Sequence, residues 1–455
     1  MTALAASKAL YELGGAEAAA LIAGGHLSVL ELNEAFIART GALEPRVNAY
    51  AFLDLDAWRA SARQLDDEAK AGRFRGPLHG IPIAIKDQFL VGGLPCKIAG
   101  TWGDTAIPAD DATPVARLRQ AGAIITGTTY MPDRFGDAPS SNLWNLEHTP
   151  GGSSSGSSAA VGGGMIPIAL GESTGGSGIR PPAFCGVEAL KPTYGRVSGS
   201  GLYVISWSLD HPTIIGRSFE DIALVYNVIA GPDPLDPTSL PDPVTAVSLS
   251  GAELRPPRIG FVRNFFLERC DDSMVAAMES AAATLRAAGA EVVDVVLPDG
   301  WGLVWPAWKV VCASERTTFH AKHTAALEAA GVDVKPDIDI FVPATYYLQA
   351  QRVRRWLLES ALTLFNDVDF LYTPAALGPA PLGHGGGDNS MNSPWATVGM
   401  PTLTFNIGLA PGGLPLGAQL TAPHLAEEPL LRAGAWCENV IGRLSIPNAA
   451  LESSS

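Results

Sequence analysis

Segments with two different hydrophobic periodicities alternate along the chain. The predicted helices, in which apolar residues recur every three to four positions, cover residues 16–40, 54–71, 113–120, 219–229 and 272–288. The predicted strands are short runs of β-branched and other apolar residues at 81–85, 123–125, 291–297, 369–373 and 416–421. Glycine follows two of these helices, at Gly122 and Gly289, as is common where a helix ends. Strands that alternate with helices predict an α/β fold, in which helices cover both faces of a sheet.

The composition predicts one large core. Of 455 residues, 47 % are hydrophobic and only 17 % are charged. Residues 232–257 contain many prolines and few helix formers, so we expect a loop there. Residues of about 300–365 are expected to form a helical elaboration, and those of about 367–425 to complete the same sheet. We therefore expect residues 1–455 to form a single domain.

The charge balance disfavours some classes of partner. Lys and Arg number 31 against 46 Asp and Glu, a net charge of -15. An acidic chain without basic runs is poorly suited to nucleic acid or to an anionic membrane. It has neither a signal-peptide pattern nor an apolar run long enough to span a bilayer, so we expect a cytoplasmic protein.

Cysteine and histidine give no metal pattern. The five cysteines are widely spaced and lack a C-x-x-C pair, which argues against a disulfide framework and against a zinc site. His320 and His323 could supply two ligands from a helix, but no third ligand has an obvious spacing, so an exposed pair is the favoured interpretation. We expect no metal and no cofactor.

Candidate chemistry concentrates in residues 150–192, where two loops rich in glycine and serine flank an apolar run at 165–170. Glycine lets backbone N–H groups turn toward a ligand, and such a loop can hold a nucleophilic hydroxyl beside donors for an oxyanion. A flexible linker is the alternative, but it does not explain the apolar run. Residues 152–156 also fit the G-x-S-x-G elbow of α/β-hydrolases, with Asp210 and His211 downstream. Residues 147–151 are poor strand formers, so we regard that match as accidental.

Lys86 lies at the end of the predicted strand 81–85. A free lysine has a pKa of about 10.4, so under roughly 1 % of it is neutral at pH 8. Burial beside Ile83 and Ile85 would lower that pKa and make Lys86 a usable base. The alternative is a surface lysine paired with Asp87.

Together these motifs resemble the amidase signature family, the Ser–cis-Ser–Lys amide hydrolases. The resemblance covers residues of about 75–230 closely and 367–435 more loosely. The matching stretches are 76–82, 86–87, 150–154, 175–177, 185–186, 190–198, 208–211, 399–401 and 413–417. The resemblance implies an amidase-signature fold, a large mixed twisted sheet covered by helices on both faces, with its signature core at about 75–230.

The resemblance also implies catalytic roles. Ser177 is the implied nucleophile, Ser153 the bridging serine after a cis peptide bond, and Lys86 the base. Neutral Lys86 would take the proton of Ser153 while Ser153 takes that of Ser177. Ser153 would then return the proton to the departing amine, and water would release the acyl group. The implied oxyanion donors are the backbone N–H groups of Thr174, Gly175, Gly176 and Ser177.

The chain departs from the family pattern around the nucleophile. The family usually reads Gly-Thr-Asp-Thr-Gly-Gly-Ser-Ile-Arg, whereas residues 171–180 read Gly-Glu-Ser-Thr-Gly-Gly-Ser-Gly-Ile-Arg. Ser173 therefore replaces the usual acid, and Arg180 lies one place later. Glu172 and Arg180 could form a displaced acid–base pair. The favoured expectation is that the supporting pair is lost and the loop is held in another way.

We expect an amidohydrolase that cleaves the C–N bond of linear carboxylic amides, with aryl amides, carbamates and esters as further candidates. Its partner would be a small-molecule substrate, with a homodimer left open. One alternative is an amidotransferase A-like component of a tRNA-dependent complex, which would need partner subunits and an RNA surface. Another is an inactive scaffold, although all three expected catalytic residue types are present.

Aromatic residues and one cysteine complete the candidates. The aromatic candidates for an acyl or aryl pocket are Phe135, Trp144, Trp207, Trp305 and Trp308. Aromatic residues more often fill cores, so each is only a candidate. Cys185 follows the predicted nucleophile loop, and a buried structural thiol is expected there.

Overall fold

The computed structural model describes residues 9–96, 107–132, 139–329 and 342–447, with side chains omitted at 320–329. Eleven strands of these residues form one sheet in the order β1-β3-β2-β4-β6-β5-β10-β11-β9-β7-β8. The strands are β1 (Tyr50–Leu53), β2 (Pro82–Lys86), β3 (Ile124–Thr129), β4 (Ile168–Ser173), β5 (Glu188–Lys191), β6 (His211–Gly216), β7 (Arg258–Val262), β8 (Glu291–Val295), β9 (Phe370–Pro374), β10 (Thr402–Leu409) and β11 (Pro415–Thr421).

The sheet is mixed, as the resemblance implied. Strand β2 runs parallel to both of its neighbours, β3 and β4. From β4 through β6, β5, β10 and β11 to β9, each pair is antiparallel. Strand β7 then pairs in parallel with β9 and β8. Segments on both sides of the predicted loop 232–257, which has no helix or strand, thus contribute to one sheet.

Helices cover both faces of the sheet, and the alternation of side chains along β10 shows this. The helices are α1 (Gly15–Ala23), α2 (Val29–Val47), α3 (Leu55–Lys70), α4 (Thr113–Gln120), α5 (Ser155–Gly162), α6 (Arg180–Cys185), α7 (Phe219–Ile229), α8 (Asp272–Ala287), α9 (Val304–Ala329), α10 (Ala344–Thr363), α11 (Ser393–Thr397) and α12 (Glu427–Ile441). Leu403 contacts Gly434 of α12, whereas the next residue, Thr404, lies on the face where Gly417 meets Ala183 of α6. Because successive strand residues point to opposite faces, α12 and α6 cover opposite sides.

The expectation of helical structure throughout residues 16–40 was wrong in one respect. The segment forms two helices, because Gly24 and Gly25 follow α1 and Gly25 takes a left-handed conformation with φ 67°. A second helix then starts at Ser28, whose side chain accepts from the Glu31 backbone N–H while Glu31 accepts from the Ser28 N–H. The other predicted helices and strands match observed elements within a few residues.

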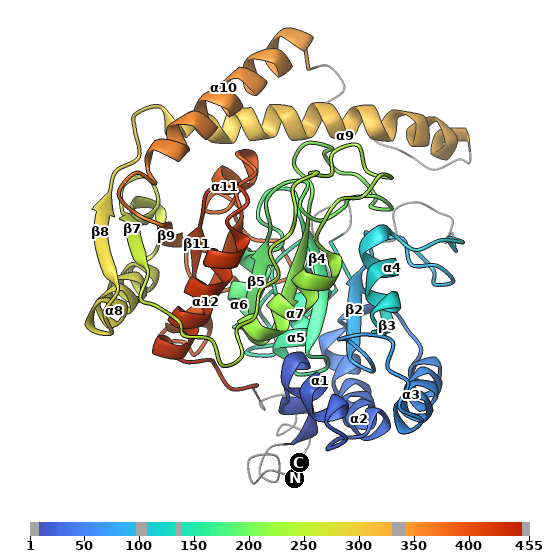
Figure 1. The fold of residues 1–455 in the computed structure, drawn as a ribbon. Coiled ribbons are helices and arrows are strands. Elements are labelled where there is room, and N and C mark those ends of the chain that lie inside the picture. Colours follow the sequence, from blue (N-terminus) through green and yellow to red (C-terminus); the bar gives the residue numbers. More distant parts are fainter. Residues whose placement is uncertain (1–8, 97–106, 133–138, 330–341, 448–455) are drawn as a thin grey trace.

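A pair of long helices lies across one end of the sheet. Helices α9 and α10 pack against each other at the top of the view in Figure 1, beyond the ends of the central strands. They fall within the predicted helical elaboration, and they bring α9 residues over the glycine loop that follows β4. In the described part of the chain, no helix is long and apolar enough to cross a membrane.

Candidate active site

Lys86 is a fully buried residue at the end of β2. It is 0 % exposed, as are Ile83 and Ile85 on the same strand. Strands β3 and β4 flank β2 on both sides, which removes this position from solvent. The alternative of a surface lysine is therefore wrong, and burial lowers the pKa of the Lys86 amine below its ordinary value.

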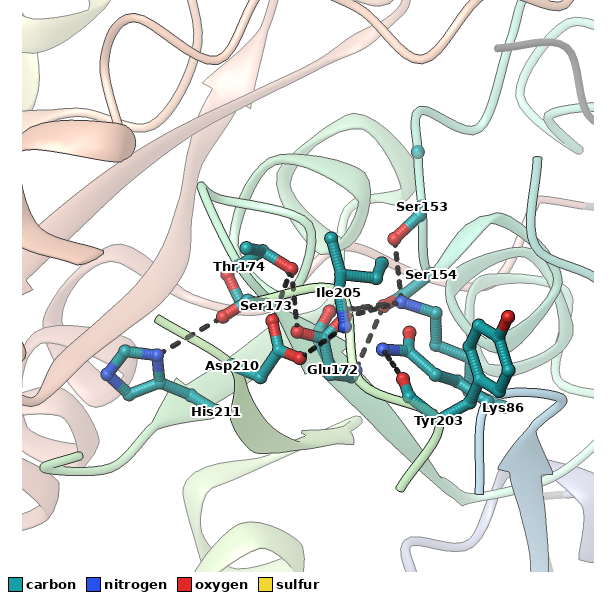
Figure 2. Close-up of polar contacts among 12 residues, drawn as sticks. Lys86, Ser153, Ser154, Glu172, Ser173, Thr174, Tyr203, Ile205, Asp210 and His211 are labelled. Atoms are coloured by element: carbon teal, nitrogen blue, oxygen red, sulfur yellow. Dashed lines mark hydrogen bonds and ion pairs between the residues drawn. The ribbon is translucent and has the colours of Figure 1, made fainter. Parts of the chain in front are cut away.

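The amine of Lys86 has three close partners (Figure 2). Its Nζ lies 2.7 Å from Ser153 Oγ, 3.0 Å from Glu172 Oε2 and 3.2 Å from the Glu172 carbonyl oxygen. Glu172 is also 0 % exposed, and its charge opposes the effect of burial by raising the pKa of Lys86. The buried amine of Lys86 is thus held between a hydroxyl and a carboxylate.

Two of the predicted serines provide the accessible surface of this site. Between residues 149 and 185 every residue is buried except Ser153 and Ser177, which are half-buried. The linker alternative is therefore wrong, because these residues form α5, β4 and α6 inside the molecule. The two serines are thus partly exposed, whereas Lys86 lies behind Ser153 and is fully buried. Among the described residues, no hydrogen bond joins the hydroxyls of Ser153 and Ser177 in this structure.

Arg180 holds the backbone on which Ser153 lies. The Gly152–Ser153 peptide bond is cis, as the resemblance implied. Arg180 Nη2 donates to the Gly152 carbonyl at 2.6 Å, and its Nε donates to the Gly386 carbonyl at 2.9 Å. The Gly152 N–H also donates to Gly386, at 3.0 Å. Burial lowers the pKa of Arg180 to about 10, so the guanidinium stays charged at neutral pH.

The favoured expectation for the departures from the family pattern is confirmed. Glu172 binds Lys86 and Thr174, and Arg180 binds backbone carbonyls, so these two residues form no pair. Ser173 supports the loop instead, because its Oγ accepts from the Gly176 N–H at 2.9 Å. That N–H, one of the four predicted oxyanion donors, is engaged within the loop in this structure.

Residues from distant segments fix the nucleophile loop. Trp308 Nε1 of α9 donates to the Thr174 carbonyl at 3.1 Å. Gly176 takes φ 119°, and a Cβ added there would lie 2.4 Å from Asn392 Cβ, so only glycine fits. The loop thus lies between α9 on one side and the segment that begins α11 on the other.

Two buried carboxyls meet at Thr174. Its Oγ1 lies 3.0 Å from Glu172 Oε1 and 2.8 Å from Asp210 Oδ1. Asp210 also accepts from the backbone N–H groups of Ile205 and Ser206. Burial, and then the nearby charge of Glu172, raise the pKa of Asp210 well above its ordinary value. Figure 2 shows this row of side chains leading to Lys86.

The α/β-hydrolase elbow is not formed. No strand directly precedes Gly152, and the structure places His211 at the start of β6, with Nδ1 against the carbonyl oxygens of Leu209 and Ser173. Burial lowers the pKa of His211 well below its ordinary value. His211 therefore supports the backbone before the nucleophile loop, and its ring nitrogens bind no serine hydroxyl among the described residues.

The aromatic, cysteine and histidine candidates do not form one common site. Trp308 contacts the nucleophile loop, whereas Trp305 stacks on Phe265 with its Nε1 donating to Ser390, and Trp144 donates to the Cys185 carbonyl. Trp207 is 44 % exposed, and Phe135 lies outside the described residues. Cys185 is buried and, like the other four cysteines, is a free thiol. The side chains of His320 and His323 lie outside the described residues, and the described ones include no group of three metal-ligating side chains.

Sequence reasoning missed the contact between Lys86 and Glu172 and the role of Thr174 and Asp210 around it. One signal was available for the first of these. Lys86 and Glu172 close two predicted apolar segments, and parallel neighbouring strands bring their carboxyl ends to the same edge of a sheet. The contacts of Asp210 depend on an antiparallel strand far along the chain, for which no such signal exists.

Comparisons with known proteins agree with this arrangement. The family model described as Amidase matches residues 31–431. The chain is 36 % identical to the A subunit of the glutamyl-tRNA(Gln) amidotransferase of Roseiflexus castenholzii, covering 93 % of this chain and 95 % of the relative. It is 34 % identical to the corresponding protein of Salinispora tropica, covering 96 % and 99 %. Among solved structures, the native peptide amidase of Stenotrophomonas maltophilia is 30 % identical, with a TM-score of 0.83 over 96 % of this chain and 98 % of that one.

Proposed function

This chain belongs to the amidase family, and we propose that it hydrolyses the C–N bond of linear carboxylic amides through an acyl-enzyme on Ser177. The observation that carries the proposal is the 2.7 Å contact between Lys86 Nζ and Ser153 Oγ. It places a buried amine with a lowered pKa directly beneath a hydroxyl that a substrate can approach.

In the proposed mechanism Lys86 is neutral before reaction. Ser153 gives its proton to Lys86 Nζ and takes the proton of Ser177, whose Oγ forms the bond to the substrate carbonyl carbon. The tetrahedral intermediate then collapses as Ser153 passes its proton to the amine, which leaves, and Ser153 takes a proton back from Lys86, which becomes neutral again. Water then attacks the carbonyl carbon of the acyl-enzyme with the same proton transfers, which breaks the ester bond to Ser177 and releases the carboxylic acid.

Backbone N–H groups of the nucleophile loop are the proposed oxyanion donors. Thr174, Gly175 and Ser177 would donate to the oxyanion, while the Gly176 N–H keeps the loop in shape through Ser173 Oγ. A donor of this kind typically contributes about a hundredfold or more to the rate, because it is already oriented when charge develops.

The substrate is proposed to be a small-molecule amide, with aryl amides, carbamates and esters as further members of the range. The acidic net charge of -15 supports a small molecule over RNA. The likeness to a solved peptide amidase supports an amide substrate.

One observation favours a second candidate function. The relatives described above are A subunits of amidotransferases, and the match covers nearly the whole of both chains. In that case the same serine and lysine would release ammonia from an amide donor for transfer to a tRNA-bound substrate, within a complex of several subunits.

A serine-directed fluorophosphonate probe tests the proposed chemistry without a known substrate. We expect wild-type protein to be labelled, Ser177→Ala to be unlabelled, and the matched control Ser158→Ala, a buried serine of α5, to be labelled like wild type. Full labelling of Ser177→Ala would show that another residue is the nucleophile.

A substrate panel then separates the two candidate functions. Purified protein is assayed against amides, anilides, carbamates and esters, and against glutamine with and without bacterial amidotransferase partner subunits. Turnover of simple amides by the chain alone supports the hydrolase. Ammonia release that requires both glutamine and the partner subunits would favour the amidotransferase.

We also propose that residues 1–455 act as one domain in the cytoplasm. The sheet shared by segments on both sides of residues 232–257 supports the first point. The five free cysteines support the second, since thiols stay reduced in that compartment.

A further inference from the structure

Glu172 occupies the position at which the family pattern has a threonine, and it places a carboxylate against the proposed base. Resting on the proposed function, we propose that Glu172 is a positioning residue, which holds Lys86 against Ser153 and stabilises the ammonium that Lys86 becomes when it accepts a proton.

The geometry makes Glu172 the direct charge partner of Lys86. Glu172 Oε2 lies 3.0 Å from Lys86 Nζ, and the backbone carbonyl of Glu172 lies 3.2 Å from the same atom. Both side chains are 0 % exposed, so water does not screen the interaction. Two acceptors from one residue leave the amine aimed at Ser153 Oγ, at 2.7 Å.

The second carboxylate oxygen of Glu172 is held by Thr174. This contact indicates which of the two neighbouring carboxyls, Glu172 or Asp210, carries the negative charge. The Thr174 hydroxyl lies within hydrogen-bond distance of Glu172 Oε1 and of Asp210 Oδ1, but it has only one proton to donate. Both contacts are satisfied when Asp210 carries a proton and donates to Thr174, while Thr174 donates to Glu172. The raised pKa of Asp210 agrees with this order. Glu172 is then the negative charge that faces Lys86.

Other titratable groups face this pair from the elements packed around it. As a carboxylate, Asp210, before β6, would raise the pKa of Lys86 less than Glu172 does, and with a proton in place it carries no charge. From α9, Cys312 lies near Glu172, Asp210, Glu315 and Arg316, and burial raises its pKa to about 12, which keeps it neutral. The carboxylate of Glu315 is occupied by Ser206, Ser208 and Tyr347.

The proposed role follows one proton. When the Ser153 Oγ–H bond breaks and an Nζ–H bond forms on Lys86, a positive charge appears where water cannot solvate it. Glu172 compensates for that charge at 3.0 Å. Loss of the carboxylate would therefore lower the proton affinity of Lys86, so that Lys86 becomes neutral at lower pH and is a weaker base.

The experiment measures the pH dependence of labelling by the fluorophosphonate probe and of ester hydrolysis in Glu172→Gln and Glu172→Thr. An opposite charge within about 4–6 Å shifts a pKa by roughly 1–3 units, so we expect the acid limb to move to lower pH by about that amount. The plateau rate should fall, because the base is weaker. Glu188→Gln is the matched control, since Glu188 is a buried carboxyl of β5 that is 2 % exposed, and its profile should follow wild type.

The outcomes separate the inference from the proposed function. If wild type is not labelled at Ser177, the proposed function itself is wrong. If wild type is labelled and the acid limb of Glu172→Gln stays in place or moves to higher pH, the inference is overturned, even where the rate falls. Should the Gln and Thr variants not fold, Glu172→Asp, which draws the charge back by one methylene, must show a smaller shift to lower pH. An unchanged limb in that variant also overturns the inference.

Discussion

Two buried lysines lie in the same sheet, Lys86 on β2 and Lys191 on β5, and they differ in what their amines meet. Their exposed fractions are 0 % and 1 %. Burial lowers the pKa of both, to about 7 for Lys191. Burial therefore favours the neutral form of both amines, which is the first requirement for a lysine base.

The partners of the two amines separate a candidate base from a structural residue. Lys86 Nζ faces the hydroxyl of Ser153, a half-buried residue that can give up a proton. Lys191 Nζ donates to the Met400 carbonyl, which has no proton to give. A lowered pKa is thus not enough to identify a base, because a proton donor must also lie on the path to the substrate.

The largest expected effect comes from replacing each amine by an apolar side chain of similar length. We expect Lys86→Met to reduce kcat/KM by about 10² to 10⁴, the usual contribution of a general base. Lys191→Met should keep kcat/KM within a few-fold of wild type. The measurement is steady-state hydrolysis, or the labelling rate with the fluorophosphonate probe, on folded protein checked by circular dichroism.

Equal losses in the two variants would break the comparison, because they would show that burial of an amine matters and its partner does not. Near wild-type activity in Lys86→Met would rule out the proposed base.

A smaller effect is expected from Arg180. It positions the backbone of Ser153, the proton donor that Lys86 has and Lys191 lacks. Arg180→Met removes the hydrogen bonds to the carbonyls of Gly152 and Gly386. Hydrogen bonds to a charged group are each worth about 1.5–3 kcal/mol, so kcat should fall by about tenfold to a hundredfold.

The control for this variant is Arg217→Met. Arg217 is a half-buried arginine, and it donates to the Tyr11 carbonyl away from the serines. We expect it to lower the thermal midpoint and to leave kcat nearly unchanged. Similar kcat values for the two arginine variants would show that Arg180 acts only on stability.

The smallest expected effect is a pH dependence of the free energy of unfolding, caused by the titration of Lys191. Its pKa is about 7 in the folded protein and about 10.4 when unfolded, so between these values the unfolded chain binds more protons. The free energy of unfolding should therefore rise with pH from about 7 to 10, by about 1.4 kcal/mol per pH unit at most. Urea unfolding of wild type and Lys191→Met over this range gives the difference. Parallel curves would mean that Lys191 is not the titrating group.

The pH dependence of wild-type activity should be set by the deprotonation of Lys86. Because Lys86 must be neutral to act, the rate should rise from neutral to mildly alkaline pH. A rise centred near pH 6 would indicate a histidine instead of a lysine.

Local sequence determined much of the fold and the identity of the candidate residues. Apolar periodicity predicted most helices and strands, since a helix face or strand must be apolar wherever it is buried. The order of short motifs around Lys86, Ser153 and Ser177 was enough to indicate the family. The break between α1 and α2 was also readable, from two glycines followed by a serine cap, although the periodicity alone concealed it.

Tertiary structure decided which groups act on these residues. Glu172 reaches Lys86 because β4 lies beside β2 in parallel, and Thr174 meets Asp210 because β6 lies beside β4 in the opposite direction. Trp308 meets the nucleophile loop because α9 crosses the end of the sheet. Local patterns encode which segments are buried, whereas strand order and helix placement depend on contacts between residues far apart in the chain. Only those contacts determine whether a buried lysine faces a hydroxyl or a carbonyl.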